Sequence, residues 1–491
     1  MHRNEGSTSS EGRDHATERP TPPKELLDFL HEAEPRTLLL CGVPGAGKTT
    51  LALSLLYALD RSSFYISTRV GRGKLLHHFP WLVGALSPDR LVDLEDVRPA
   101  SDRQEDLLRL LDQLTDSIDP LSAGRRIRDF LDVPETLARA LGETPARAGH
   151  RFLFIDSWEG LVEPYIHLLG LDDLGRSSLE HGLLSLFHAA GFSLVLCAEG
   201  TAPQALSYLA DGVVELRSEA LDGGILRHFE VRKLRGVSIP RTSTAFTLHG
   251  GYFTCCPPLP HLLRPPHGVI PHTAAPTGPL EALSFGIPCL DQSVGVIAPG
   301  ETILTELDGK VSSIPLIALL GPLYLRALQG GWKVTLLTDL ALSPRVVSET
   351  LRHDFPEAAQ SFELQHLPTS SRRGPKELWE DLRASLGPRT VLGVSVRSLM
   401  ALTPLPGEDL VSRIAELQIL AREQGAVLSL VIGARDPLLS LLATLVPLHL
   451  TLTDHHGTFI IGGRYPVVPR VAILVEGSSD RDRHYRYVPV A

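Results

Sequence analysis

The sequence predicts an α/β protein of two tandem domains, each with a mostly parallel sheet flanked by helices. Strand-like and helix-like segments alternate from Arg36 onward, which is typical of a parallel sheet with helices on both faces. The same order of segments returns in the second half, after a proline-rich stretch. A chain of 491 residues is also too long for one ordinary core.

Four regions follow from composition. Residues 1–23 are polar and proline-rich, which favours a disordered tail. Residues 24–254 form the first predicted domain, and residues 255–280 form a proline-rich linker. Residues 281–491 form the second domain, whose last stretch, 477–491, is expected to be a frayed terminus.

In the first domain, a helix is expected over 22–33, opened by proline. Continuous apolar runs predict buried strands at 37–42, 63–68, 151–157 and 192–200. Helices are expected over 48–59 and 183–191, a long charged and helix-rich insert over 71–149, and two antiparallel strands within 211–236. In the second domain we expect strands at 302–307, 332–339, 389–396 and 426–434, a helix over 313–331, and antiparallel strands within 448–476.

Charge and hydropathy exclude several classes of protein. The net charge of −10 does not favour nucleic acid or an anionic membrane as a partner of the whole surface. No apolar run reaches the ~18 residues of a membrane span, and the polar N-terminus lacks the apolar core of a signal peptide. We therefore expect a cytoplasmic protein without membrane contact.

A phosphate-binding loop follows the first predicted strand. The run Gly42-Val-Pro-Gly-Ala-Gly-Lys48-Thr49 matches G-x-x-x-x-G-K-[ST] between a strand and a helix. Its glycines let backbone N–H groups turn toward one anion, and the helix N-terminus adds a favourable dipole. In this pattern Lys48 reaches the β- and γ-phosphates, and the Thr49 hydroxyl binds Mg²⁺. The cofactors expected are ATP and Mg²⁺, and the nucleotide-binding residues are Gly42, Val43, Pro44, Gly45, Ala46, Gly47, Lys48, Thr49 and Thr50.

A second Mg²⁺-binding residue is expected in Asp156. Four apolar residues precede it in "FLFIDS", so that it ends a buried strand at the Walker B position. In a parallel sheet this strand end faces the phosphate-binding loop. A strand-terminal aspartate in an ordinary turn is the alternative.

These motifs resemble the KaiC-like branch of the RecA-type ATPases. The matching pieces are "CGVPGAGKTT", "FLFIDS", "LVLCAEG" and the segment 211–236. The resemblance implies that both domains are RecA-like, and that the last segment is a β-ribbon ending in Lys-x-Arg-Gly, here Lys233-Leu-Arg235-Gly236. It also implies that Lys233 and Arg235 contact the γ-phosphate held by a neighbouring subunit, as arginine fingers do.

Two alternatives to this role remain open. Lys233 and Arg235 could instead be a solvated basic turn, in a monomeric switch with a cis site alone. If sites form between subunits, the working protein is a homo-oligomer, either filament-like or a ring, with a hexameric ring as one form.

The second half resembles another domain of this type without its chemistry. "SFGIPCLDQSVGVIAPGETILTELDGK" is similar to the opening of a KaiC-type domain. Aligning the strands places Ser313 where the loop lysine belongs and Ile314 at the threonine, while Lys310 comes three residues too early. Ser395 stands at the Walker B position. We therefore expect a degenerate domain without a phosphate-binding loop, which serves assembly or regulation.

The catalytic base of the first domain is unassigned. KaiC-like ATPases place a glutamate after the second strand, where this chain has Ser67, Thr68 and Arg69. Neither hydroxyl is a base at neutral pH, and arginine is a cation. Glu159 and Glu199 are the candidate replacements. The segment "YISTRV…FPWL" resembles the GvpD family of gas-vesicle regulators, which implies ATP-gated regulation through a protein partner.

Three functions are compatible with these features. The first is a KaiC-like regulatory protein, either a slow Mg-ATPase or an ATP-gated switch that acts on a protein partner. The second is a non-hydrolysing pseudo-ATPase scaffold. The third is a recombinase-type DNA-binding ATPase, which would need a basic, mobile loop between the Walker B and sensor strands; the acidic stretch 158–178 argues against it. A phosphotransferase is compatible with a phosphate-binding loop alone.

Overall fold

The structure, a computed structural model, divides into two compact units that meet in the sequence at Cys255 and Cys256. It describes residues 20–490 except 60–62, 85, 94–97, 100–119, 144–150, 202–203, 222–223, 260–279, 310, 312, 339–361, 367–374, 404 and 477–483. Most of the expected linker (255–280) therefore lies outside the described residues. None of the helices in the described ranges is long and apolar enough to cross a membrane.

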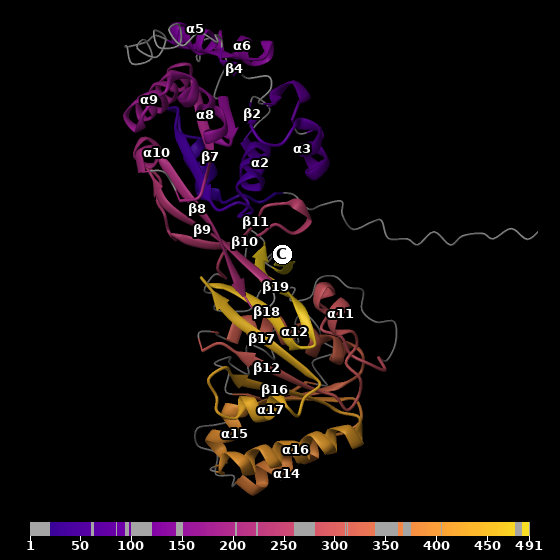
Figure 1. Cartoon of the computed structure of the whole chain (residues 1–491). Coiled ribbons are helices and arrows are strands. Elements are labelled where there is room, and N and C mark those ends of the chain that lie inside the picture. The colour runs from indigo at the N-terminus through magenta and orange to yellow at the C-terminus, as the bar shows by residue number, and fades with distance from the viewer. Residues whose placement is uncertain are drawn as a thin grey trace, which may run out of the picture. The chain divides into compact units, whose positions relative to one another are not determined.

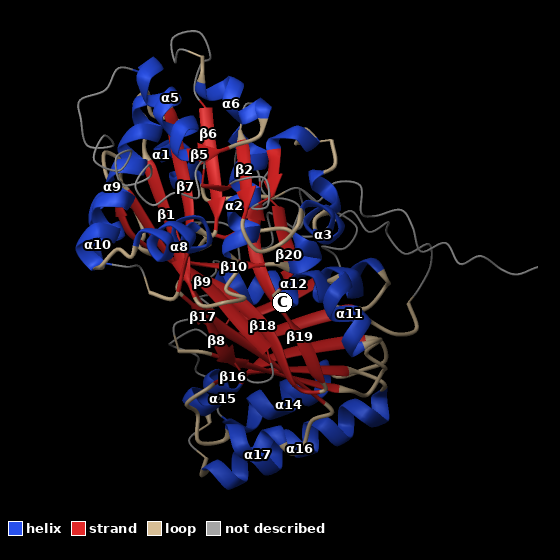
Figure 2. Ribbon diagram, turned by 45° about the horizontal axis from the view of Figure 1, so that its top comes forward, coloured by secondary structure: helices blue, strands red, loops and turns tan. Residues whose placement is uncertain are grey.

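Unit 1 contains a nine-stranded sheet, shown in Figures 1 and 2. Its strands, in spatial order, are β11 (Thr254–Cys256), β10 (Ser243–Thr247), β9 (Gly224–Leu234), β8 (Gly212–Leu221), β1 (Thr37–Gly42), β7 (Phe192–Glu199), β6 (Arg151–Asp156), β2 (Phe64–Ser67) and β3 (Leu91–Asp93). The strands from β8 to β3 pair in parallel. Because two residues alone join β8 to β9, that neighbouring pair must be antiparallel, as expected for the segment 211–236.

Two hydrophobic clusters cover the two faces of this sheet. Alternate residues along a strand point to opposite faces, so Leu38 and Leu40 belong to one cluster and Leu39 and Cys41 to the other. The first face is covered by α1 (Lys24–Leu30), α2 (Lys48–Leu59) and α3 (Arg72–His78). The second is covered by α5 (Pro120–Phe130), α6 (Glu135–Leu141), α8 (Trp158–Leu169), α9 (Asp173–Ala189) and α10 (Gln204–Leu209).

Smaller elements complete unit 1. They are the 3-10 turns η1 (Pro80–Leu82), η2 (Pro88–Arg90) and η4 (His249–Gly251), and a two-stranded sheet of β4 (Arg98–Pro99) and β5 (Leu131–Asp132). The insert expected over 71–149 thus supplies an edge strand, β3, as well as helices. Thr21, expected in the tail, pairs with Thr254, and its N–H lies 2.9 Å from the Phe253 carbonyl.

The stretch after the Walker B strand is helical. Residues 158–178 form α8 and the beginning of α9, and the side chains of Ser157 and Asp172 cap the two helices. The segment in which a DNA-binding ATPase would need a mobile basic loop is therefore regular secondary structure. Its side chains Trp158 and Leu161 are buried in the core.

Unit 2 contains a second nine-stranded sheet. Its strands, in spatial order, are β14 (Phe362–His366), β13 (Lys333–Thr338), β15 (Thr390–Ser395), β16 (Val427–Gly433), β12 (Thr302–Leu307), β17 (Leu448–His455), β18 (Thr458–Tyr465), β19 (Val467–Glu476) and β20 (His484–Pro489). The first six are parallel, and the last three continue the sheet in antiparallel pairs. One face packs on α11 (Pro288–Val294) and α12 (Ser313–Gln329). The other packs on α14 (Pro375–Ser385), α15 (Val396–Leu402), α16 (Gly407–Gln424) and α17 (Leu439–Ala443), which lie together in Figure 2.

The two sheets have the same topology. When the strands of each main sheet are numbered along the chain, both sheets have the spatial order 3-2-4-5-1-6-7-8-9. The expectation of two α/β domains with mostly parallel sheets is confirmed. A shared order of nine strands is also what an internal duplication would produce.

The C-terminal tail corrects one expectation. Residues 484–489, which were expected to fray, form the strand β20 instead. It pairs antiparallel with β19, so that Pro489 stands opposite Val471 and His484 stands opposite Glu476. Tyr485 is 2% exposed in the core of unit 2, and the Tyr487 hydroxyl donates to the Ala318 carbonyl at 2.6 Å. The charged residues around the two tyrosines, among them Arg486 between them, hid an alternating strand pattern.

Candidate nucleotide-binding site

The loop between β1 and α2 has the backbone that its glycines predict. Gly42, Gly45 and Gly47 adopt φ values of 151°, 79° and 105°, which side chains other than glycine rarely tolerate. A Cβ on Gly42 would lie 2.4 Å from the Leu216 carbonyl oxygen, so this position also needs glycine for space. Around Gly45 no atom lies within 4 Å of such a Cβ. The backbone at Gly45 therefore borders open space.

The remaining loop residues divide by burial. Val43, Pro44 and Gly45 are exposed, whereas Ala46 and Thr50 are buried. Lys48 begins α2 and is 6% exposed, and its Nζ donates to the Gly42 carbonyl at 2.7 Å and to the Val43 carbonyl at 3.1 Å. The ammonium group is thus folded back over the loop that would hold the phosphates.

The Walker B residue lies beside this loop. Asp156 ends β6, and its Oδ2 accepts hydrogen bonds from Thr49 Oγ1 at 2.6 Å and from Tyr65 OH at 2.8 Å. Tyr65 is fully buried on β2. Burial, reinforced by the charge of Asp156, raises the pKa of Tyr65 well above its usual value, so the phenol remains a donor. The two residues expected to bind Mg²⁺ are therefore in direct contact.

This arrangement fits a nucleoside triphosphate with Mg²⁺. The open, glycine-lined loop at the N-terminus of α2 supplies backbone N–H groups for phosphate, and the hydroxyl and carboxylate oxygens of Thr49 and Asp156 suit a hard cation. Bound Mg²⁺ would neutralise negative charge on the phosphates.

The end of β2 offers no carboxylate. Ser67 is the last residue of the strand, and its hydroxyl donates to the Val70 carbonyl at 2.6 Å. The Thr68 hydroxyl accepts a hydrogen bond from the Ser157 N–H at 2.6 Å. Both hydroxyls hold the backbone near Asp156.

Two glutamates approach the loop from other elements. Glu199 ends β7 opposite Gly42, and its Oε2 lies 3.3 Å from Lys48 Nζ. Its other oxygen accepts from Arg69 Nη1 at 2.7 Å. Glu159, in the first turn of α8, accepts the Glu199 N–H at 3.0 Å, and its second oxygen is buried without a hydrogen-bond partner in the described part of the chain. Both candidate bases are therefore near the loop, and Glu199 contacts its lysine.

Lys233 and Arg235 lie at the opposite end of β1. The Arg235 N–H donates to the Asp211 carbonyl, and the Asp211 N–H donates to the carbonyl of Thr37, the first residue of β1. The five steps along β1 from Thr37 to Gly42 separate this edge from the loop by roughly 16 Å, at about 3.3 Å per step. Arg235 pairs with Asp211 at 3.1 Å, and Lys233 donates to the carbonyls of Ser207, Tyr208 and Ala210. The structure does not bring these two residues into the site of their own chain.

The corresponding positions of unit 2 lack this chemistry. Ser313 is the first residue of α12, six residues after the end of β12, just as Lys48 follows the end of β1 by six. Ser395 ends β15, the strand that corresponds to β6, and its hydroxyl caps α15 through the Ser398 N–H. Lys310 lies outside the described residues. The alignment of Ser313 with Lys48 and of Ser395 with Asp156 thus agrees with the element boundaries.

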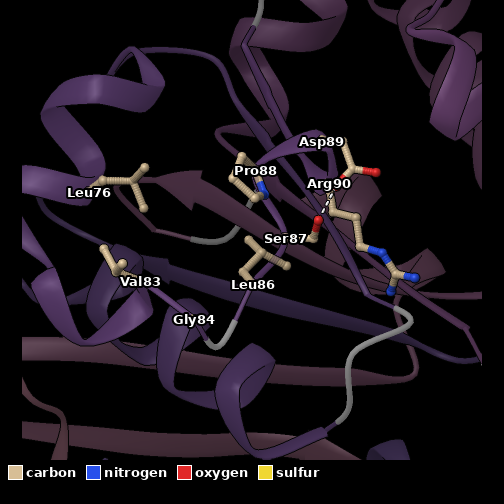
Figure 3. A pocket seen from close by; sticks show the side chains of 8 residues that line it. All are labelled: Leu76, Val83, Gly84, Leu86, Ser87, Pro88, Asp89 and Arg90. Carbon is tan, nitrogen blue, oxygen red and sulfur yellow. Dashed lines mark hydrogen bonds between the residues drawn. The ribbon is translucent and has the colours of Figure 1, made fainter.

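A hollow of about 410 Å³ lies elsewhere in unit 1, between α3 and β3. It is lined by Leu76, Val83, Gly84, Leu86, Ser87, Pro88, Asp89 and Arg90. In Figure 3 the guanidinium of Arg90 points away from Leu76, Val83 and Leu86. The hollow shares no residue with the phosphate-binding loop.

Sequence reasoning did not identify Tyr65 as a partner of Asp156. A signal was present, because a tyrosine in a buried strand needs a hydrogen-bond partner for its hydroxyl. The strand that pairs with the Walker B strand is where such a partner would be sought.

Comparison with known proteins agrees with this site. Residues 26–234 match the family described as GvpD gas vesicle protein, P-loop domain. Protein GvpD1 of Halobacterium salinarum is 30% identical over 247 residues, which cover 48% of this chain and 41% of that protein. Protein GvpD2 of the same organism is 29% identical over 246 residues, covering 48% of this chain and 44% of that protein. The chain thus spans less than half the length of either relative, and residues 26–234 of unit 1 are similar to the P-loop domain of GvpD proteins.

Proposed function

We propose that unit 1 binds Mg-ATP and that its nucleotide state regulates a protein partner. Gly42 to Thr50 would hold the phosphates, and Thr49 and Asp156 would hold Mg²⁺. The observation that carries this proposal is the 2.6 Å contact between Thr49 and Asp156 at the edge of an open glycine loop. The hydroxyl and the carboxylate are only partly buried, and both of their oxygens are suited to a divalent cation.

Regulation is favoured over rapid turnover by the end of β2. Arg69 and two engaged hydroxyls occupy the place where a water-activating carboxylate would stand, so hydrolysis would depend on Glu159 or Glu199. Glu199 is held by two cations, so both of its oxygens are already engaged and are not free to orient a water molecule. We therefore propose a slow ATPase or an ATP-gated switch, with a non-hydrolysing scaffold as the second candidate.

The partner and the assembly are part of the same proposal. The family that residues 26–234 match is described as a gas vesicle protein, and ATP-gated action on a regulatory protein would suit a domain of this type. Lys233 and Arg235 are too far from their own loop to contact its phosphate, so a role in ATP chemistry requires a second subunit. A homo-oligomer, such as a ring, is the arrangement that would bring them to a neighbour's site.

Titration calorimetry with ATP and Mg²⁺, paired with an assay of phosphate release, tests the proposal. The Lys48→Ala variant removes the loop cation, and Lys74→Ala, an exposed lysine on α3, is its matched control. Because a hydrogen bond to a charged group contributes about 1.5–3 kcal/mol, Lys48→Ala should weaken ATP binding about tenfold or more. Lys74→Ala should bind as the wild type does.

The outcomes separate the candidates. Slow phosphate release that Lys48→Ala abolishes identifies a working ATPase. Tight, Lys48-dependent binding without release identifies a switch or scaffold. Absence of ATP binding by the wild-type protein contradicts the proposed function.

A further inference from the structure

Arg69 and Glu199 form an ion pair at the mouth of the phosphate-binding loop. Glu199 Oε1 lies 2.7 Å from Arg69 Nη1, and Glu199 Oε2 lies 3.3 Å from Lys48 Nζ. One carboxylate therefore joins the buried loop lysine, 6% exposed, to an arginine whose side chain is 52% exposed. The three groups come from different elements, α2, β7 and the turn after β2.

The position of Glu199 is fixed by the backbone. Glu199 stands opposite Gly42 in the β1–β7 ladder, and its N–H donates to Glu159 Oε1 at 3.0 Å. The Gly200 N–H donates to the Gly42 carbonyl, the same oxygen that accepts from Lys48. The carboxylate of Glu199 is thus held beside the first residue of the loop, where its negative charge would face the phosphates of a bound nucleotide.

These charges cannot all remain in place when a triphosphate binds. Phosphate oxygens at Lys48 would lie next to the Glu199 carboxylate, and like charges in contact repel. The repulsion is relieved if Glu199 turns away from Lys48, which separates it from Arg69 as well. Arg69 is exposed and long enough to follow the phosphate, whereas Lys48 is buried and anchored to two loop carbonyls.

We infer that Arg69 pairs with Glu199 when no nucleotide is bound, and that it moves to the terminal phosphate of a nucleoside triphosphate bound in the same subunit. This inference rests on the proposed nucleotide binding by unit 1. Arginine suits the role because its planar guanidinium contacts two phosphate oxygens at once. A diphosphate lacks the terminal group that would compete with Glu199, so Arg69 would remain paired with the carboxylate. Arg69 therefore favours triphosphate over diphosphate, and Glu199 is its partner when no terminal phosphate is bound.

Binding of a non-hydrolysable ATP analogue and of ADP, each with Mg²⁺, tests this by calorimetry on the full chain. Arg69→Ala should weaken analogue binding about tenfold or more while changing ADP binding less than about threefold, because charged bidentate contacts are strong. Arg69→Lys keeps the positive charge but loses the planar guanidinium. Its affinity for the analogue should therefore lie between those of the wild type and Arg69→Ala. Arg72→Ala, a neighbouring exposed arginine outside the site, is the matched control and should leave both affinities unchanged.

Glu199→Gln tests the other half of the pair. Removal of the negative charge that holds Arg69 should strengthen binding of the analogue more than binding of ADP, because only the triphosphate has to displace Glu199 from Arg69. The difference between the two affinities should therefore widen. Thermal unfolding of each variant checks that the fold is retained, and Arg69 is exposed enough that its replacement should leave the melting temperature near that of the wild type.

Each result has one meaning. Equal weakening of analogue and ADP by Arg69→Ala, or no effect on either, overturns the inference while leaving nucleotide binding intact. A wild-type protein that binds neither nucleotide overturns both this inference and the proposed function. A selective loss of analogue binding supports the assignment of Arg69 to the terminal phosphate.

Discussion

Asp156 is held by two hydroxyl groups through one carboxylate oxygen. Thr49 would leave this contact to bind Mg²⁺, whereas Tyr65 is buried and has no other role in the site. Tyr65 therefore keeps Asp156 in position when Thr49 leaves the carboxylate to bind Mg²⁺. A group that orients a metal ligand in this way commonly affects metal affinity without touching the metal.

Tyr65→Phe should separate this positioning role from packing. The variant keeps the ring but removes the hydrogen bond to Asp156, so Mg²⁺-dependent ATP binding should weaken several-fold and the free energy of unfolding should fall by about 1 kcal/mol. Calorimetry at several Mg²⁺ concentrations measures the first effect, and urea unfolding measures the second.

Tyr165→Phe is a matched control for this experiment. Tyr165 is 2% exposed in the same unit, but its hydroxyl is buried without a hydrogen-bond partner among the described residues. Loss of that hydroxyl should leave ATP binding unchanged and stability equal or slightly higher. Equal behaviour of the two variants in Mg²⁺ dependence would contradict a positioning role for Tyr65.

Strands and helices with strong apolar patterns were predicted well from the sequence. The strands at 37–42 and 302–307 and the helix at 48–59 match the structure residue for residue, because each is a mostly apolar segment bounded by glycine or charge. The edge strands β3 and β20 were missed. Edge strands are short and carry charged side chains, so their sequences resemble loops.

The site was predictable as far as its motif extends. Loop glycines, Lys48, Thr49 and Asp156 follow from a pattern in which spacing determines geometry. Tyr65 and the Arg69–Glu199 pair do not, because they depend on which strands become neighbours. The order β1-β7-β6-β2 brings together residues that are 91 positions apart for Tyr65 and Asp156 and 130 positions apart for Arg69 and Glu199, and no local pattern encodes these contacts.

The strand β20 gives a direct test of the corrected C-terminus. Tyr485→Ala removes a buried ring from the core of unit 2 and should lower the free energy of unfolding by about 3 kcal/mol. His484→Ala, exposed on the same strand, should cost about 1 kcal/mol or less. Urea unfolding followed by circular dichroism measures both, and a frayed terminus would make the two variants equal.

The two units share a fold but differ in chemistry. Both sheets have the same strand order, yet only the first has a lysine at the start of the helix and an aspartate at the end of the fourth strand. Sheet order depends on the apolar pattern of the strands, whereas nucleotide binding depends on a few residues at the ends of those strands. Two domains can therefore share a fold although one of them has serine, at Ser313 and Ser395, where the other has the lysine and the aspartate of the site.

Replacement of Arg235 tests whether the protein works as a monomer or as an oligomer. Because Arg235 lies at the edge of β1 opposite the loop, Arg235→Ala should leave the Kd for ATP within about twofold of the wild type. If Arg235 contacts the nucleotide of a neighbouring subunit, the same variant should lower phosphate release or ATP-dependent assembly. An assay of phosphate release measures the first, and light scattering after size-exclusion chromatography measures the second. Arg217→Ala, similarly exposed on β8, is the control and should change neither. Loss of ATP affinity in dilute, monomeric Arg235→Ala would contradict the geometry, whereas loss of assembly alone would place the residue at a subunit interface.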